Sequence, residues 1–110
     1  MNVMRRLALL PLCFVALTAC SGLTIGREFP APTRETIRNG ATTKADLVRL
    51  FGEPTQVGID DGDTTWTWLY VARSTDKELT KQLTVRFRSD GVVKSYSYSS
   101  NFPEDMRTFR

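Results

Sequence analysis

Hydrophobic and polar residues follow a different pattern in each part of this 110-residue chain, and each pattern predicts a different kind of segment. The first is an almost wholly apolar run from Leu7 to Ala19, which directly follows Arg5 and Arg6. Its thirteen residues would span only about 20 Å as a helix, less than the roughly 30 Å hydrocarbon core of a bilayer. A basic start before a short apolar run is typical of a secretory signal peptide.

The end of this signal indicates how it is removed. Leu17, Thr18 and Ala19 are followed directly by Cys20, and this order resembles the lipobox of bacterial lipoproteins. The resemblance implies that residues 1–19 are cleaved as a lipoprotein signal peptide. It also implies that the sulfur of Cys20 then carries lipid, with palmitate as one acyl chain. A plain signal peptide followed by a chance cysteine is the alternative.

The rest of the chain divides into three regions. From Ser21 to Pro32, glycine and proline recur among small and charged residues without a lasting period. This predicts that residues 20–32 form a lipidated N-terminus and flexible linker, with a reach on the order of 20 Å. Periodic patterns between residues 33 and 100 predict one folded domain. Residues 101–110 are expected to form a loose C-terminal tail.

Two short helices are expected at the start of the domain. Residues 34–38 lie between capping residues and could form one to two helical turns. Residues 44–51 give the firmer prediction, because Thr43 and Asp46 have the spacing of a capping box and Gly52 would end the helix. Its apolar face would consist of Leu47, Val48, Leu50 and Phe51.

Three strands are expected after these helices. Residues 55–64 are rich in glycine and aspartate and predict a loop. Apolar and polar residues then alternate over residues 66–71, 82–88 and 92–99, and the last two runs are separated by a tight turn. The sequence therefore predicts an α+β fold of the order ααβββ, in which two short helices pack on a three-stranded antiparallel meander.

The register of the last hairpin decides which way Tyr96 and Tyr98 point. A three-residue turn with a glycine bulge would pair Phe87 with Val93 and place both tyrosines on the outer face. A two-residue turn would bring the tyrosines into the core and set Lys94 opposite Phe87. We favour the first arrangement because an ammonium group beside a core phenylalanine is costly, although a further bulge beyond Val93 would change either outcome.

Charge and composition restrict the function. Without residues 1–19, which include Arg5 and Arg6, the chain has 91 residues with 13 basic and 12 acidic side chains. This near-neutral domain gives no argument for nucleic-acid binding. Cys13 leaves with the signal and Cys20 would carry lipid, so no thiol remains for catalysis, and the chain contains no histidine. We therefore expect neither an enzyme nor a cofactor nor a metal site.

Three clusters could carry chemistry, and each also has a structural interpretation. They are Asp60, Asp61 and Asp63; Trp66, Trp68 and Tyr70; and Arg86, Arg88 and Lys94. The acidic cluster could bind a cation, but it lacks the ligand spacing of a calcium loop, which favours a solvated turn. The aromatic cluster could stack on a ligand but is more typical of a core face. The basic cluster would gather on the outer face, where it would meet solvent or anionic lipid.

The stretch from Ile37 to Pro54 resembles the helical signature of the SmpA/OmlA (BamE-like) family of small outer-membrane lipoproteins. The resemblance continues in the same order through residues 68–73 and 83–93. It implies the same ααβββ fold and a non-catalytic lipoprotein that is anchored in the outer membrane and faces the periplasm. Ser21 agrees with this location, because an aspartate there would be the familiar signal for retention at the inner membrane.

The resemblance also implies partners. Family members bind other envelope proteins, including β-barrel assembly components, and anionic phospholipid is a further candidate. The positions that match their contact surface are Val57, Ile59, Leu69 and Arg73. The loop before Trp66 departs from that of the assembly-machine subunit, because it is longer, acidic and without an aromatic residue.

Two functional hypotheses follow. The first is a small assembly or stabilising subunit of a cell-envelope complex. The second is a free-standing envelope-binding module that recognises lipid, cell wall or a single protein partner, such as an enzyme to be inhibited. Binding to β-barrel assembly components would separate the two.

Overall fold

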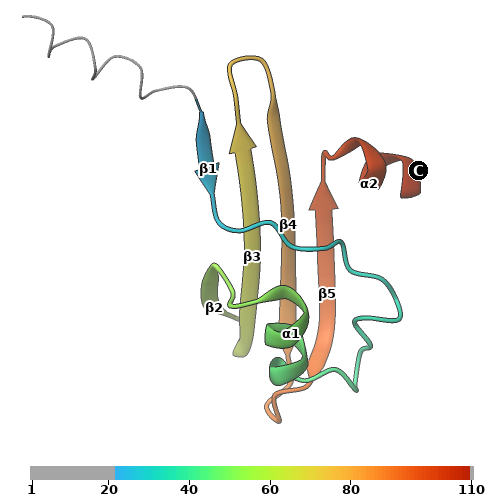
Figure 1. Ribbon diagram of the computed structural model, residues 1–110. Helices are drawn as coiled ribbons and strands as arrows, with labels where there is room; N and C mark the ends of the chain where they lie inside the picture. The colour runs from blue at the N-terminus through green and yellow to red at the C-terminus, as the bar shows by residue number, and fades with distance from the viewer. Residues whose placement is uncertain (1–21, 110) are drawn as a thin grey trace, which may run out of the picture.

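The computed structural model describes residues 22–109. The signal peptide, the lipobox and Cys20 lie outside the described residues, so our expectations for them stay predictions. In chain order the elements are β1 (Leu23–Ile25), α1 (Lys44–Phe51), β2 (Gln56–Asp60), β3 (Asp63–Arg73), β4 (Glu78–Phe87), β5 (Val93–Ser100) and α2 (Pro103–Thr108). Figure 1 shows a sheet of long and short strands with short helices beside it, which confirms the α+β class.

The sheet contains five strands, not the three that the sequence predicts. β3, β4 and β5 form the expected antiparallel meander. In addition, β2 pairs with residues 63–67 of β3, and β1 pairs with residues 71–73 on the same edge. The loop predicted over residues 55–64 is therefore wrong, because these residues form β2 and a hairpin turn. Asp61 and Gly62 in that turn have positive φ angles of 51° and 86°, as a two-residue hairpin requires.

The segment predicted as a flexible linker belongs to the domain from residue 23 onward. β1 is hydrogen-bonded to β3, and Phe29 is buried in the core. Between them Gly26 has a φ of 75°, and a Cβ atom at this position would lie 2.0 Å from the carbonyl oxygen of Leu69. Only glycine fits such a close approach of two backbones. A strand of three residues is too short to be recognised by alternation, so β1 could not be predicted from its local pattern.

The helix predicted over residues 44–51 is confirmed as α1, with the same bounds. The Thr43 hydroxyl accepts a hydrogen bond from the Asp46 N–H at 3.2 Å, and the Asp46 carboxylate accepts one from the Thr43 N–H at 3.0 Å. These reciprocal bonds complete the capping box and fix where the helix begins. Leu47 and Phe51 then bury one side of α1 against the sheet.

The other predicted helix, over residues 34–38, is not formed. A single turn takes its place, in which the Ile37 N–H donates to the Thr33 carbonyl oxygen at 3.1 Å. Ile37 is nevertheless buried, so this turn anchors the long connection between β1 and α1 to the core. The second helix of the fold lies instead at the C-terminal end of the chain.

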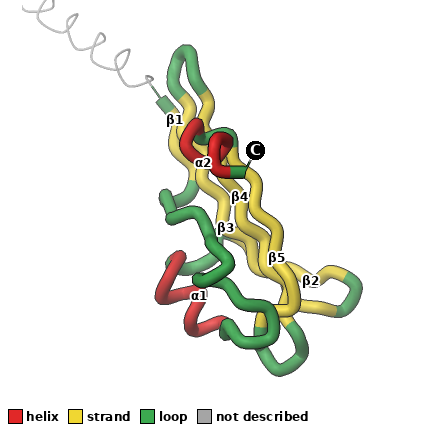
Figure 2. Tube along the Cα trace, turned by 90° about the vertical axis from the view of Figure 1, so that its right-hand side faces the viewer, coloured by secondary structure: helices red, strands yellow, loops and turns green. Residues whose placement is uncertain are grey.

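The buried apolar side chains gather on one face of the sheet. The main core cluster consists of Phe29, Ile37, Leu47, Phe51, Trp68, Leu83, Val85, Phe87 and Val93. Figure 2 shows α1 and the connection before it on a single side of the strands. Trp68 is 2 % exposed, and Trp66 and Tyr70 pack against the same cluster. This confirms the interpretation of the aromatic stripe as a core face.

The last hairpin combines features of both registers considered for it. Phe87 pairs with Val93, as favoured, but a bulge at Lys94 shifts the following pairs so that Val85 faces Tyr96. The outward placement of the tyrosines is therefore wrong, because Tyr96 and Tyr98 pack against the core. The bulge adds two aromatic rings to a small core and leaves the Lys94 ammonium free to reach an aspartate on the outer face.

The C-terminal residues are not a loose tail. α2 follows β5 directly, and Phe102 at its start is buried. The ammonium of Lys81, itself buried, lies 4.2 Å from the centre of the Phe102 ring and donates a hydrogen bond to the carbonyl oxygen of Phe29 at 3.0 Å. One lysine thus connects the N-terminal segment, the middle of β4 and the start of α2.

A second buried charge fixes α2 to β5. The Asp105 carboxylate accepts hydrogen bonds from the hydroxyls of Tyr98 at 2.8 Å and Ser100 at 2.7 Å. Burial of the Tyr98 ring, together with the neighbouring carboxylate, raises the pKa of the Tyr98 hydroxyl. The tyrosine therefore remains a proton donor to Asp105 throughout the neutral range.

The contact at Lys81 predicts a loss of stability in Lys81→Met. Methionine keeps the length of the side chain but leaves the buried Phe29 carbonyl without a donor, which should lower the free energy of unfolding by about 1–3 kcal/mol. Urea unfolding followed by tryptophan fluorescence measures the change, with the exposed Lys77→Met as the control. Equal or greater stability of Lys81→Met would mean that desolvation of the ammonium outweighs its contacts.

Candidate docking surface

Among residues 22–109, no helix lies on the side of the sheet opposite α1, and we call this side the open face. Because side chains alternate along a strand, the residues between the core positions point to this face. They are Thr65, Thr67, Leu69, Val71 and Arg73 on β3, Thr80, Gln82, Thr84 and Arg86 on β4, and Ser95, Ser97 and Ser99 on β5. Most are short and polar, as expected for a sheet that is buried on one side only.

One corner of the open face is apolar. Leu23 and Ile25 of β1 stand opposite Arg73 and Val71 of β3, so their side chains share this face, and Leu69 lies two residues further along. Leu23 is 49 % exposed and Ile25 is 43 % exposed. We call Leu23, Ile25, Leu69 and Val71 the apolar corner. Exposed apolar side chains that gather on an otherwise polar face mark a contact site.

The backbone beneath the apolar corner is held firmly. Leu69 pairs with Gln82 of β4 on one side, and on the other side it lies in the gap between β1 and β2, where neither strand reaches it. Its N–H donates instead to the Thr55 hydroxyl at 3.0 Å, and the Thr55 N–H donates to the Thr67 carbonyl oxygen at 2.7 Å. Thr55 and the close approach of Gly26 therefore cover the backbone of Leu69 at this edge and hold its side chain on the open face.

The four contact positions implied by the family resemblance do not form one surface. Leu69 and Arg73 lie together on the open face, where the Arg73 guanidinium pairs with Glu78 at 2.6 Å. Val57 pairs with Trp66 in register, so Val57 and Ile59 point to the opposite face, near the tip of the β2–β3 hairpin. They are 62 % and 79 % exposed. The structure thus offers two separate apolar surfaces, one on each face.

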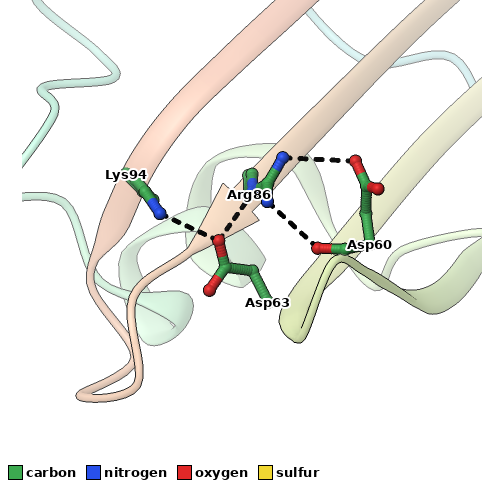
Figure 3. A network of polar contacts seen from close by, with 4 residues as sticks. All are labelled: Asp60, Asp63, Arg86 and Lys94. Carbon is green, nitrogen blue, oxygen red and sulfur yellow. Dashed lines mark hydrogen bonds and ion pairs between the residues drawn. The ribbon is translucent and has the colours of Figure 1, made fainter.

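A network of charged side chains lies at the other end of the open face (Figure 3). The Arg86 guanidinium donates to the Asp63 carboxylate at 2.7 Å, to the Asp60 carboxylate at 3.2 Å and to the Asp60 carbonyl oxygen at 3.1 Å. The Lys94 ammonium donates to the same Asp63 oxygen at 3.0 Å. Hydrogen bonds from Arg86 and then Lys94 lower the pKa of Asp63, and Asp63 in turn raises the pKa of Arg86.

This network changes two interpretations. The acidic turn is not simply solvated, because Asp60 and Asp63 bind cationic side chains of β4 and β5. The basic cluster is not a free positive patch, because Arg86 and Lys94 pair with those aspartates and Arg88 pairs with Asp90 at 2.6 Å. It therefore gives no support to lipid binding at this end of the sheet. What the network does is tie the hairpin tip to the two strands beside it.

Leu23 and Ile25 are the site residues that sequence reasoning missed. The only signal for them is the alternation of Leu23, Thr24 and Ile25, which three residues cannot distinguish from chance. Over residues 22–109, no three histidine, cysteine, aspartate or glutamate side chains gather as a possible metal site. Neither helix in the described part of the chain is long and apolar enough to cross a membrane.

An antiparallel sheet that is covered on one face and carries an apolar corner on the other defines a small α+β domain with a candidate docking surface. The family model for the outer membrane protein assembly factor BamE domain matches residues 29–97. The chain therefore belongs to the BamE family, which confirms the resemblance seen in the sequence and places it among envelope proteins associated with the outer membrane. No curated protein and no solved structure gives a significant match. Leu23 and Ile25 lie ahead of the matched range.

The charged network predicts a pH-dependent contribution to stability. The folded pKa of Asp63 is lowered, so its contribution is fully present above the unfolded value of about 3.9 and is lost as the pH falls through the folded value. Asp63→Asn should therefore unfold at lower urea concentration than the parent at pH 7, and this difference should shrink below about pH 3.9. Asp61→Asn, in the same turn, is the control. An equal loss at both pH values would assign the effect to geometry rather than charge.

Proposed function

We propose that this protein is a non-catalytic, lipid-anchored subunit that assembles or stabilises a protein complex of the outer membrane, and that it binds its partner through the apolar corner of the open face. The observation that carries this proposal is the exposure of Leu23 and Ile25 on a face that no helix of residues 22–109 covers. Membership of a family described as assembly factors supports the same conclusion.

The form of the corner suits contact with another protein. Its aliphatic side chains provide an apolar centre, and the threonine, serine and glutamine side chains around it can form a polar rim. The Arg73–Glu78 pair stands at the border, where an exposed ion pair adds little to stability but can orient an approaching partner. A rigid backbone at Leu69 reduces the ordering that binding requires.

The tether would be short. Only two residues separate Cys20 from Leu23, and three peptide units span at most about 10 Å. With lipid on Cys20, β1 and the apolar corner would lie near the membrane surface, and the hairpin tip would lie at the far end of the sheet. Such confinement raises the effective concentration of other membrane-held partners and allows weak contacts to suffice.

Leu23→Glu tests the proposed contact. A carboxylate on this exposed position should disrupt an apolar interface at least about tenfold, because burial of an unpaired charge is costly, while the fold remains intact. Crosslinking in intact cells followed by mass spectrometry measures the partner yield. Ile59→Glu, at a more exposed apolar position on the opposite face, is the control and should retain the partner.

The outcomes separate the competing functions. Loss of the partner in Ile59→Glu alone would move the docking surface to the β2–β3 hairpin. Recovery of no β-barrel assembly component with the parent protein would favour a free-standing envelope-binding module that recognises lipid, cell wall or a single protein.

Cys20→Ala tests the role of the tether. The domain rests on its own core, so circular dichroism of the variant should match that of the parent, while the variant should fail to restore envelope integrity in a deletion strain. Detergent sensitivity of the cells measures that function, and Cys13→Ala, within the signal peptide, should behave as the parent. Full restoration by the Cys20→Ala form would contradict the proposal.

A further inference from the structure

Within the described residues, the outer edge of β5 is unpaired along most of its length. β5 is the last strand of the sheet, and β4 occupies only one of its edges. At the start of β5 the free edge is used by the chain itself, because Val93 donates to the Thr42 carbonyl oxygen at 2.8 Å and accepts from the Gly40 N–H at 2.7 Å. Beyond Val93 this coverage ends. Figure 2 looks onto this side of the molecule and shows β5 running along it toward α2.

The pattern of hydrogen bonds identifies the free groups. The Arg88 N–H donates to the Val92 carbonyl oxygen, and the Asn101 N–H donates to the Thr80 carbonyl oxygen. The backbone groups of the even-numbered residues of β4 therefore point toward β5. By alternation, the N–H and C=O groups of Tyr96 and Tyr98 point away from the sheet. Within residues 22–109, no hydrogen bond to these groups is formed.

This edge lacks the usual protection against pairing. Exposed edge strands are normally blunted by charged side chains, proline or bulges. β5 has one bulge, at Lys94, and the six residues from Ser95 to Ser100 contain only serine and tyrosine. The opposite edge of the sheet is treated differently, because β1, β2 and the Thr55 hydroxyl cover β3. Because the edge of β3 is covered and that of β5 is not, we interpret the edge of β5 as a binding site.

A pocket of about 270 Å³ lies beside the open edge, on the core side of β5. Its lining residues are Pro32, Thr33, Arg34, Tyr96, Tyr98 and Phe109. The Phe109 ring packs edge-on against Tyr98 with 5.9 Å between the ring centres, yet Phe109 remains largely exposed. The Arg34 guanidinium forms no ion pair with any acidic side chain in the described part of the chain.

We propose that β5 binds an extended segment of a partner protein as an additional strand of the sheet. The segment would pair with the backbone of Tyr96 and Tyr98, place a phenylalanine or similarly large apolar side chain in the pocket, and carry a carboxylate side chain that reaches Arg34. Strand addition gains affinity from main-chain hydrogen bonds, and alternate side chains in pockets give specificity. This surface is distinct from the apolar corner and goes beyond the proposed docking function.

The unpaired charge favours this occupant over a second copy of the chain. Arg34 calls for an anionic partner group beside an aromatic one. In a two-fold pairing of β5 with itself, the residues brought to the edge would again be the serines and tyrosines of Ser95 to Ser100, none of which carries a charge at neutral pH.

The test uses the purified processed protein and a synthetic probe. The probe is the hexapeptide Thr-Val-Thr-Phe-Thr-Glu, acetylated at one end and amidated at the other. In nitrogen–proton NMR spectra, addition of the peptide should shift the Tyr96 and Tyr98 amide signals and slow their exchange with solvent at least about tenfold, because new hydrogen bonds protect them. Ser95 and Ser97 are internal controls, since their amides already face β4.

Two matched comparisons test the chemistry. A peptide N-methylated at alternate residues keeps its side chains but cannot pair, and it should not bind. Arg34→Gln should weaken binding of the glutamate peptide about fivefold and leave a glutamine version of the peptide unaffected, whereas Arg38→Gln should change neither. Unchanged Tyr96 and Tyr98 signals at about 1 mM peptide would overturn the proposal. Shifts that depend on protein concentration alone would also overturn it, because the occupant would then be a second copy.

Discussion

The supply of large apolar side chains is the constraint on which the rest of this structure depends. The domain has enough of them to cover one face of its sheet. The segments that pack on that face are α1, α2 and the long connection from Phe29 to Thr43. On the other face apolar side chains gather only in the apolar corner, and short hydroxyl and amide side chains occupy most of the rest. A sheet that is buried on one side must present the other to solvent or to a partner.

The same shortage explains why buried polar groups fasten the ends of the chain. Lys81 and Asp105 are buried, and each has hydrogen-bond partners among neighbouring groups. These contacts join the N-terminal segment to β4 and α2 to β5. Without a disulfide to hold them, the two ends depend on such contacts for their order.

Local rules predicted the elements whose signals are local, and they failed where distant segments decide the outcome. The bounds of α1 follow from Thr43, Asp46 and Gly52, and the meander follows from alternation, so both could be read from the sequence. β1 forms by antiparallel pairing with the edge of β3, which lies far away in the sequence. In the register that β5 adopts, the Lys94 ammonium donates to Asp63, which is 31 residues away in the chain, and no local pattern reveals this contact.

The same distinction between local and long-range signals applies to the residues of the candidate site. Leu69 and Arg73 were identified from the family resemblance, but their neighbours Leu23 and Ile25 join them through pairing with β3, which no local pattern reveals. Val57 and Ile59 were placed in the same set, and the register of β2 assigns them to the other face. A period of two residues fixes which side chains share a face only once the strand partners are known.

The two edges of the sheet differ in how they are covered, and this difference bears most directly on function. Two short strands and a threonine hydroxyl close the edge of β3, and closure there produces the apolar corner, because β1 brings Leu23 and Ile25 onto the open face. Within residues 22–109, the edge of β5 is covered at Val93 and open beyond it. The binding role that we propose depends on which backbone groups and apolar side chains this surface leaves uncovered.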